Sequence, residues 1–201
     1  MYIICCDLEG VFVPEIWINV SKKTGIEELR LTTRDIPDYN VLMQKRLKIL
    51  DEHNLKIKDI QDVIATMDPL EGAKPFLDFL REHSQVIIVS DTFTQFAGPL
   101  MKKLNWPTLF CNTLEIEEDG RISGYKLRQH DGKRHVVLAL KSLNYEIIAM
   151  GDSYNDISML KEADKGFLFC PPDNIVTEFP EFPVRRDYDG LKNDLIEILN
   201  P

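Results

Sequence analysis

The sequence predicts an α/β fold, in which a doubly wound, mostly parallel sheet carries a small helical cap inserted after the first strand. Two observations predict the sheet. Short apolar runs of strand length recur along the 201 residues, and helical patterns with an apolar period of about 3.6 residues separate them. A third observation predicts the insertion, because one long stretch after the first strand holds helical patterns alone.

Five apolar runs are the expected strands of the parallel sheet. They lie at residues 2–7, 85–91, 108–112, 145–152 and 165–170. Each is almost continuously apolar, which is typical of strands that are buried on both faces.

Helical patterns lie between the expected strands, at residues 71–83, 94–104 and 133–143. Alternation of strands and helices predicts a parallel sheet with helices on both of its faces. One segment, residues 114–128, breaks this rhythm with a polar–apolar alternation around Asp119-Gly120, which predicts a β-hairpin.

The expected insertion contains three helical patterns, at residues 15–26, 38–53 and 56–67. The segment "DPLEG" at residues 68–72 then marks the return to the main body, with proline and glycine as breakers. We therefore expect a catalytic core formed by residues 1–14 and 70–201, and a helical cap formed by residues 15–69.

Composition limits the possible partners and the cellular location. The formal net charge is −9, which argues against a nucleic-acid or anionic-membrane surface. The four cysteines, Cys5, Cys6, Cys111 and Cys170, form no C-x-x-C pair and are expected to be buried free thiols. With no signal peptide or membrane span in the sequence, we expect a cytoplasmic protein. Trp17 and Trp106 are expected to pack. The oligomeric state, monomer or homodimer, stays open.

Three expected strands end in oxygen-bearing side chains. In an open parallel sheet these ends share one edge, where ligands bind. Clustered carboxylates stay ionised together only around a cation, and hard oxygen ligands suit Mg²⁺, which commonly bridges to a phosphate. The pattern therefore predicts a Mg²⁺ and phosphoryl site. Its residues are Asp7 and Glu9, Ser90 and Asp91, and Asp152, Asn155 and Asp156.

The spacing of Asp7 and Glu9 suits phosphoryl transfer in two steps. One carboxylate can attack phosphorus and carry an aspartyl-phosphate. The second can protonate the leaving oxygen and later activate the acceptor. Ser90 offers a hydroxyl to the phosphoryl group, and Lys133, at the start of an expected helix, offers a positive charge.

Four segments resemble the four motifs of the haloacid dehalogenase superfamily. They are "DLEGV" at residues 7–11, "VSDT" around Ser90, Lys133, and "GDSYND" at residues 151–156. The helical insertion resembles the cap of the phosphoserine phosphatase branch. "DLEGVFVPEIW", "TTRDIPDYNVLMQKRLKILDEH" and "GDSYNDISML" are similar to the bifunctional bacterial group that also acts as phosphoserine:homoserine phosphotransferase.

The resemblance implies a Rossmann-like core and a Mg²⁺-dependent phosphoserine phosphatase that works through an aspartyl-phosphate. In that family the first aspartate, here Asp7, is the nucleophile, and Ser90 and Lys133 hold the phosphoryl group. The implied metal ligands are Asp7, the backbone carbonyl of Glu9, and Asp152, with Asp156 in support.

The resemblance also implies residues that recognise the substrate. Glu15 would hold the ammonium group of phosphoserine and Arg46 its carboxylate, in agreement with the bidentate fork of arginine. Tyr39 would pack against the substrate, and Asp91 and Asn155 complete the expected binding residues. Two residues depart from the usual pattern: Glu9 replaces an aspartate, and Asp91 replaces the glycine after the serine of the second motif.

Other interpretations stay open at this point. The aspartyl-phosphate can pass to homoserine instead of water, which would make the protein a phosphotransferase. Receiver domains of signalling proteins also place acids, a hydroxyl and a lysine at strand ends, although they lack this insertion. The replacement at Glu9 is compatible with an inactive ligand-binding relative. By default Lys133, Arg46 and Glu15 would be solvated surface charges.

Overall fold

A single mixed sheet runs through the computed structural model, which describes residues 1–33, 35, 36 and 38–199. Its strands are β1 (Tyr2–Cys6), β2 (Gln85–Phe93), β3 (Thr108–Ile116), β4 (Ile122–Lys126), β5 (Glu146–Gly151), β6 (Lys165–Phe169) and β7 (Val184–Arg185). Their order is β4-β3-β2-β1-β5-β6-β7. Only β4 pairs antiparallel with its neighbour in this part of the chain. The mostly parallel sheet is therefore confirmed.

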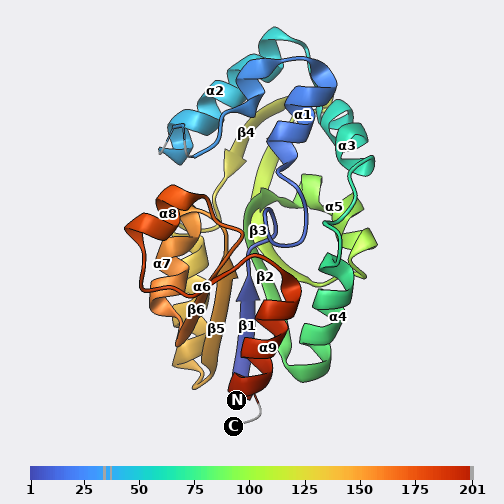
Figure 1. Cartoon of the computed structure of the whole chain (residues 1–201). Helices are drawn as coiled ribbons and strands as arrows, with labels where there is room; N and C mark the ends of the chain where they lie inside the picture. Colours follow the sequence, from blue (N-terminus) through green and yellow to red (C-terminus); the bar gives the residue numbers. More distant parts are fainter. Residues whose placement is uncertain (34, 37, 200–201) are drawn as a thin grey trace.

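Helices cover both faces of the sheet (Figure 1). The α-helices are α1 (Ile16–Thr24), α2 (Tyr39–Glu52), α3 (Ile57–Ala65), α4 (Ala73–His83), α5 (Thr94–Lys103), α6 (Gly132–Ser142), α7 (Ile157–Glu162), α8 (Asp173–Glu178) and α9 (Tyr188–Leu199). Two short 3₁₀ helices are η1 (Glu27–Arg30) and η2 (Tyr154–Asp156). None of the helices in the described ranges is long and apolar enough to cross a lipid bilayer.

The central strand β1 shows why the sheet is buried on both sides. Its side chains alternate between the two faces. Ile4 and Cys6 belong to the apolar cluster that includes α4, α5 and α9. Ile3 and Cys5 belong to the cluster on the other face, which includes α6, α7 and α8. All four side chains are buried, so β1 is held rigidly and its carboxyl end is a fixed platform.

Some elements lie outside the predicted set, and one predicted boundary is wrong. The strand expected at 108–112 and the hairpin expected at 114–128 share one continuous strand, β3, which pairs with β2 in its first part and with β4 in its second. The two-residue strand β7 and the C-terminal helix α9 are among the additional elements.

The expectation that all four cysteines are buried is wrong for two of them. Cys5 and Cys6 are buried within β1, whereas Cys111 is half-buried and Cys170 is exposed. Cys170 follows β6 with a left-handed φ of 46°, so the chain turns there out of the apolar layer. Trp106 is likewise not packed: it is 67% exposed in the loop before β3.

The insertion, the segment between β1 and α4, contains α1, η1, α2 and α3, which gather beyond the carboxyl ends of the strands (Figure 1). The chain leaves and re-enters the core at neighbouring points, because the Leu70 N–H donates to the Phe12 carbonyl at 2.9 Å. The other end of the insertion touches the β3–β4 hairpin, where the Ile57 N–H donates to the Gly120 carbonyl at 2.9 Å. The division into a core and a cap at residues 15 and 69 stays a prediction.

Candidate active site

Three adjacent strands place the predicted acids and the predicted serine at one edge of the sheet. The strands β2, β1 and β5 are parallel neighbours, so their carboxyl ends lie side by side. Asp7 directly follows β1, Asp152 directly follows β5, and Ser90 lies within the last part of β2. All three side chains are buried. The structure thus brings together residues that are far apart in the sequence.

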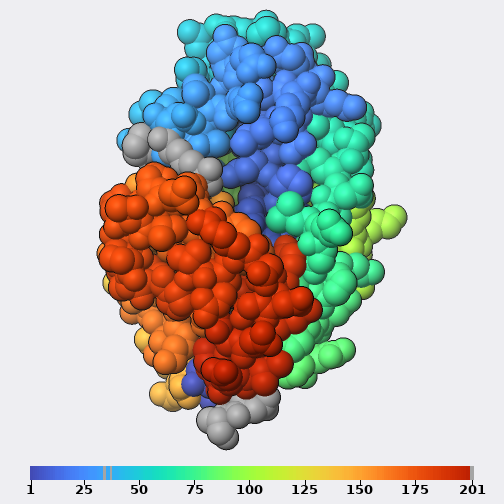
Figure 2. Space-filling model, viewed as in Figure 1, coloured from blue at the N-terminus to red at the C-terminus, as the bar shows by residue number. Residues whose placement is uncertain are grey.

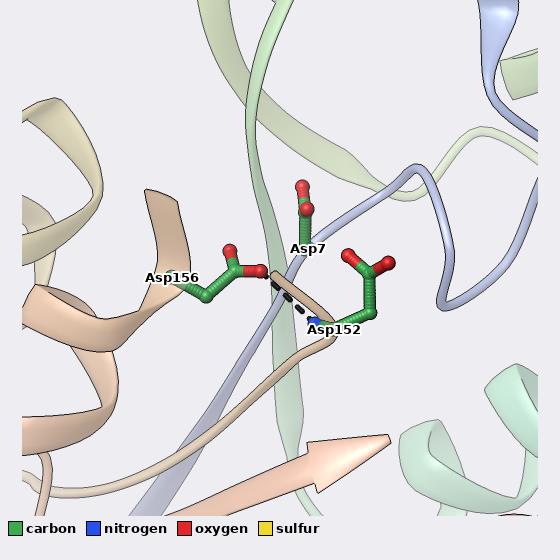
Figure 3. Close-up of side chains that lie close together, drawn as sticks. All are labelled: Asp7, Asp152 and Asp156. Carbon is green, nitrogen blue, oxygen red and sulfur yellow. Dashed lines mark hydrogen bonds between the residues drawn. The ribbon is translucent and has the colours of Figure 1, made fainter. Parts of the chain in front are cut away.

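Asp7, Asp152 and Asp156 form a compact carboxylate cluster (Figure 3). Each offers an oxygen, and these oxygens lie within 4.8 Å of one another. Asp156 is fully buried, and its Oδ2 accepts hydrogen bonds from the backbone N–H groups of Asp152 and Ser153 at 3.0 Å. Asp156 therefore fixes the loop that carries Asp152, while Asp7 and Asp152 face a common space.

Lys133 supplies the positive charge of this cluster. Its Nζ lies 2.9 Å from Asp7 Oδ2 and 2.7 Å from Asp156 Oδ1, and its side chain is 3% exposed. Burial opposes the charge, but Asp156, Asp7 and Asp91 together raise the pKa of Lys133 well above its usual value. Lys133 is therefore no solvated surface residue but the direct ionic partner of Asp7.

One lysine does not neutralise three buried carboxylates. Burial and the repulsion of Asp156 and Asp152 raise the pKa of Asp7, even though Lys133 lowers it. A divalent cation among the carboxylates would offset that repulsion, and carboxylate oxygens are ligands that Mg²⁺ prefers. The donor set formed by Asp7, Asp152 and Asp156 therefore fits a hard divalent cation.

Glu9 lies between the sheet edge and the insertion. Its Oε2 accepts a hydrogen bond of 2.7 Å from the N–H of Ile16, the first residue of α1. Burial and the nearby charge of Glu15 raise the pKa of Glu9 to about 8, although the Ile16 N–H lowers it. A carboxyl group that keeps its proton near neutral pH can act as a general acid.

Arg46 is the main cationic group on the insertion side. It is 6% exposed, it lies 4.6 Å from the centroid of the Trp17 ring, and its Nη2 donates to the Leu31 carbonyl at 2.9 Å. Burial lowers the pKa of Arg46 to about 10, so the guanidinium stays charged at neutral pH. Its buried Nε–H has no hydrogen-bond partner among the described residues, which leaves donor capacity for a ligand.

Asp91 joins the two sides of the site. Its backbone carbonyl accepts a hydrogen bond of 3.0 Å from the Tyr39 hydroxyl on α2. Its carboxylate accepts one of 2.8 Å from Asn155 Nδ2 and lies 3.8 Å from Lys133 Nζ. An acid at this position is thus compensated by Asn155 and Lys133, which answers why it is tolerated beside Ser90.

A pocket between the sheet edge and the insertion collects nearly all the predicted residues, and the surface is hollowed between the insertion, in blue, and the orange and red core elements (Figure 2). The predicted residues that line it are Asp7, Glu9, Glu15, Tyr39, Arg46, Ser90, Asp91, Asp152 and Asn155. Lys133 lines the adjoining, wider cavity instead, and Asp156 lies behind the pocket.

Other residues of the site were not singled out by the sequence. Trp17, expected only to pack, is buried but also lies under Arg46 and lines the pocket. Thr32 and Thr33 line it as well; they begin the quoted segment "TTRDIPDYNVLMQKRLKILDEH", but no role was expected of them. Gly10 has a φ of +77°, and a Cβ there would lie 2.4 Å from Asp152 Cγ. The hint that the sequence offered for Gly10 is its place inside the motif "DLEGV" at residues 7–11.

Comparison with protein families agrees with this geometry. The family model of the haloacid dehalogenase-like hydrolases matches residues 13–164. The chain belongs to this family. The resemblance read from the motifs is thereby confirmed, and membership in a hydrolase family favours an enzyme over a receiver-like signalling module.

Relatives and solved structures extend the comparison over the whole chain. The phosphoserine phosphatase ThrH of Pseudomonas aeruginosa is 58% identical over 98% of this chain and 96% of that protein. A phosphoserine phosphatase of Pseudomonas syringae pv. tomato is 60% identical over 98% of this chain and 84% of that protein. A crystal structure of a phosphoserine phosphatase in its apo form superposes with a TM-score of 0.75 at 24% identity, covering 98% of this chain and 96% of the other. The haloacid dehalogenase-like fold is therefore established.

Proposed function

We propose that this protein is a Mg²⁺-dependent phosphoserine phosphatase that hydrolyses O-phosphoserine to serine and phosphate. One observation carries the proposal: a single pocket is lined both by Asp7 and Asp152 of the carboxylate cluster, with Lys133 in contact with Asp7, and by the buried Arg46. The first suits a phosphoryl group and the second a carboxylate. Two relatives at 58% and 60% identity carry the name phosphoserine phosphatase, which supports the same substrate.

The chemistry proceeds in two half-reactions. An oxygen of Asp7 attacks phosphorus, the bond to the serine oxygen breaks, and Glu9 gives its proton to that oxygen. In the second half-reaction Glu9 takes a proton from water, whose oxygen attacks phosphorus and releases Asp7. Ser90 and Lys133 hold the phosphoryl oxygens. The contact of 2.9 Å between Lys133 and Asp7 supports these roles.

Asp7, Asp152 and the backbone carbonyl of Glu9 would hold Mg²⁺, with Asp156 fixing the loop of Asp152. When bound, the cation would supply positive charge against the carboxylates and the phosphoryl oxygens. The carboxylate cluster supports this assignment because its internal repulsion needs a cation.

Recognition of the amino-acid part belongs to the insertion, which we propose to act as a cap over residues 15–69. The carboxylate of phosphoserine pairs with Arg46, and its ammonium group pairs with Glu15. Tyr39 packs against the substrate, next to Asp91 and Asn155. The lining of the pocket by all five side chains supports this arrangement. We further propose a cytoplasmic location and small-molecule substrates only.

A substrate panel tests the proposal. Purified protein with Mg²⁺ is given phosphoserine, phosphothreonine, glycerol phosphate and p-nitrophenyl phosphate, and free phosphate is followed. We expect the highest kcat/KM for phosphoserine. If glycerol phosphate is turned over equally well, the amino-acid assignment is wrong.

The same panel with added homoserine distinguishes the acceptor. Phosphohomoserine and free phosphate are measured together, because transfer and hydrolysis share the first half-reaction. We expect free phosphate as the main product. Phosphohomoserine in excess over free phosphate would make the protein a phosphotransferase instead.

A further inference from the structure

The loop between β1 and α1 determines where the site residues Glu9 and Gly10 lie. It closes on itself through three backbone hydrogen bonds: Gly10 N–H to Val13 carbonyl at 2.9 Å, Phe12 N–H to Leu8 carbonyl at 2.9 Å, and Val13 N–H to Leu8 carbonyl at 3.1 Å. The loop is therefore a compact unit, and we expect it to shift as a whole. Any displacement of it displaces Glu9 relative to Asp7.

Gly10 ties the position of this loop to that of Asp152. A Cβ on Gly10 would lie 2.4 Å from Asp152 Cγ and 2.5 Å from its Oδ2. The backbone of the loop is thus in close contact with the carboxylate of Asp152. Loop and carboxylate constrain each other, so the loop sets the geometry of two of the groups used in the proposed reaction.

Two bonds from outside the loop hold its outward carbonyls. One is the bond from the Leu70 N–H to the Phe12 carbonyl, at the return of the chain from the insertion. The other comes from the far end of the sequence: the hydroxyl of Tyr188 donates to the Val11 carbonyl at 2.7 Å. Val11 is fully buried, so no water replaces that donor readily.

Tyr188 is itself held firmly. Its ring stacks between Phe76 of α4 and Phe169 of β6, with both ring centroids at 4.8 Å, and its Cδ2 would lie 3.0 Å from a Cβ on Gly72. Burial and the neighbouring Cys170 raise the pKa of Tyr188, so its hydroxyl remains a donor. Tyr188 begins α9, which lies beside α4 on one face of the sheet (Figure 1).

We infer that Tyr188 is a positioning residue of the phosphoryl-transfer reaction: its hydroxyl fixes the 8–13 loop, and through that loop the positions of Glu9 and Asp152. The inference rests on the proposed function for the roles of Glu9 and Asp152. It also gives the C-terminal helix a part in the chemistry, although α9 contributes no residue to the lining of the pocket.

The test uses Tyr188→Phe, which removes the hydroxyl and keeps both ring stacks. We expect kcat to fall about tenfold with an unchanged KM for phosphoserine, because a small misplacement of reacting groups is costly while Arg46 and Glu15 are untouched. Hydrogen–deuterium exchange of peptides that cover residues 8–13 should be faster than in the wild type. A kcat within about twofold of wild type, or unchanged exchange, overturns the inference.

Two control variants separate positioning from general destabilisation. Tyr2→Phe removes a hydroxyl that interacts with Glu146 at the opposite end of β1 and should leave kcat and the exchange of the loop unchanged. Phe169→Leu loosens the stack on the other side of the Tyr188 ring but keeps the Tyr188 hydroxyl, so it should lower the Tm while kcat stays within about twofold of wild type. If Phe169→Leu lowers kcat as much as Tyr188→Phe does, the hydroxyl is not the cause and the inference fails.

The assays also keep this inference apart from the proposed substrate. Hydrolysis of p-nitrophenyl phosphate uses the same loop but none of the amino-acid contacts, so Tyr188→Phe should slow it as well. Failure of the wild type to prefer phosphoserine refutes the substrate alone. A normal rate of Tyr188→Phe on p-nitrophenyl phosphate refutes the role of Tyr188 alone.

Discussion

The two sides of the pocket differ in how far their polar groups are already satisfied. At the sheet edge, Lys133 contacts Asp7 and Asp156, and Asp156 also accepts two backbone N–H groups. On the insertion side, the equally buried Arg46 keeps a free Nε–H among the described residues. The sheet edge is thus a pre-formed ionic network, whereas the insertion side has a hydrogen-bond donor that is still available to a ligand.

This difference indicates that the phosphoryl chemistry belongs to the sheet edge and the recognition of the substrate to the insertion side. A pre-formed network acts on any phosphoryl group that reaches it, because its charges need no reorganisation. A buried donor without a partner gains most from a ligand that supplies an acceptor. The comparison therefore predicts that changes at the sheet edge affect every substrate, whereas changes at Arg46 affect only substrates with a carboxylate.

Replacement of the nucleophile should have the largest effect. Asp7→Asn keeps the shape of the side chain but removes its attacking oxygen, so we expect kcat to fall by at least about a thousandfold on every phosphomonoester. Phosphate release from phosphoserine and from p-nitrophenyl phosphate measures it, and the Tm confirms that the variant is folded. Retained turnover of either substrate would contradict the uniform role of the sheet edge.

Weakening of the cation site should have the second-largest effect. We expect Asp152→Asn to lower kcat about a hundredfold at fixed Mg²⁺ and to raise the Mg²⁺ concentration needed for half-maximal activity. Binding also has a readout without turnover: Mg²⁺ at about 100 times its Kd should stabilise the wild type by about 2.7 kcal/mol. That gain, measured by thermal unfolding with Mg²⁺ or with a chelator, should shrink in the variant. Full wild-type activity in excess chelator speaks against the site.

Loss of the guanidinium tests the other side of the comparison. Arg46→Ala should lower kcat/KM for phosphoserine by about ten- to a hundredfold, because a charged hydrogen bond contributes about 1.5–3 kcal/mol. Turnover of p-nitrophenyl phosphate should change little. Arg46→Lys should restore only part of the loss, since an ammonium group forms no fork. Equal damage to both substrates would break the distinction between the two sides.

A pair of glycine variants should have the smallest effect, and the two variants are closely matched. Gly10 and Gly25 both have a left-handed backbone, with φ of +77° and +75°, but only Gly10 has a neighbour, because nothing lies within 4 Å of a Cβ on Gly25. Each change to alanine should cost about 1 kcal/mol of stability from the backbone alone. Only Gly10→Ala should also displace Asp152, and we expect about a tenfold lower kcat and a higher Mg²⁺ requirement. If the two variants have similar kcat values and similar Mg²⁺ requirements, the contact of Gly10 with Asp152 does not affect the cation site.

The sheet edge could be predicted from the sequence because its evidence is local. Continuous apolar runs place Asp7 and Asp152 at strand ends, and strand ends of a parallel sheet share one edge. Lys133 was harder, since an isolated lysine is usually solvated; its place at the start of an expected helix suggested only a positive charge, and the resemblance assigned it to the phosphoryl group. Its contacts with Asp7 and Asp156 depend on how α6 packs, which no short pattern encodes.

The insertion side was predictable only in outline. The helical period identified α1, α2 and α3, but the contact of Arg46 with Trp17 and Leu31 depends on how these helices cross. Tyr188 lay beyond prediction altogether, because its partner Val11 is at the other end of the chain. Contacts between distant segments follow from the fold, and the sequence reveals the fold more readily than such single bonds.

The hydrogen bond between Leu70 and Phe12 has a consequence for how such enzymes can be rebuilt. It holds the two ends of the insertion together at a single point of the core. We expect that a foreign helical segment which replaces residues 15–69 has to match this separation, and also the contacts of the insertion with the β3–β4 hairpin and with Asp91. Chimaeras joined at Pro14 and Pro69 would measure whether the substrate range changes with the inserted segment while β1, the 8–13 loop and α4 stay the same.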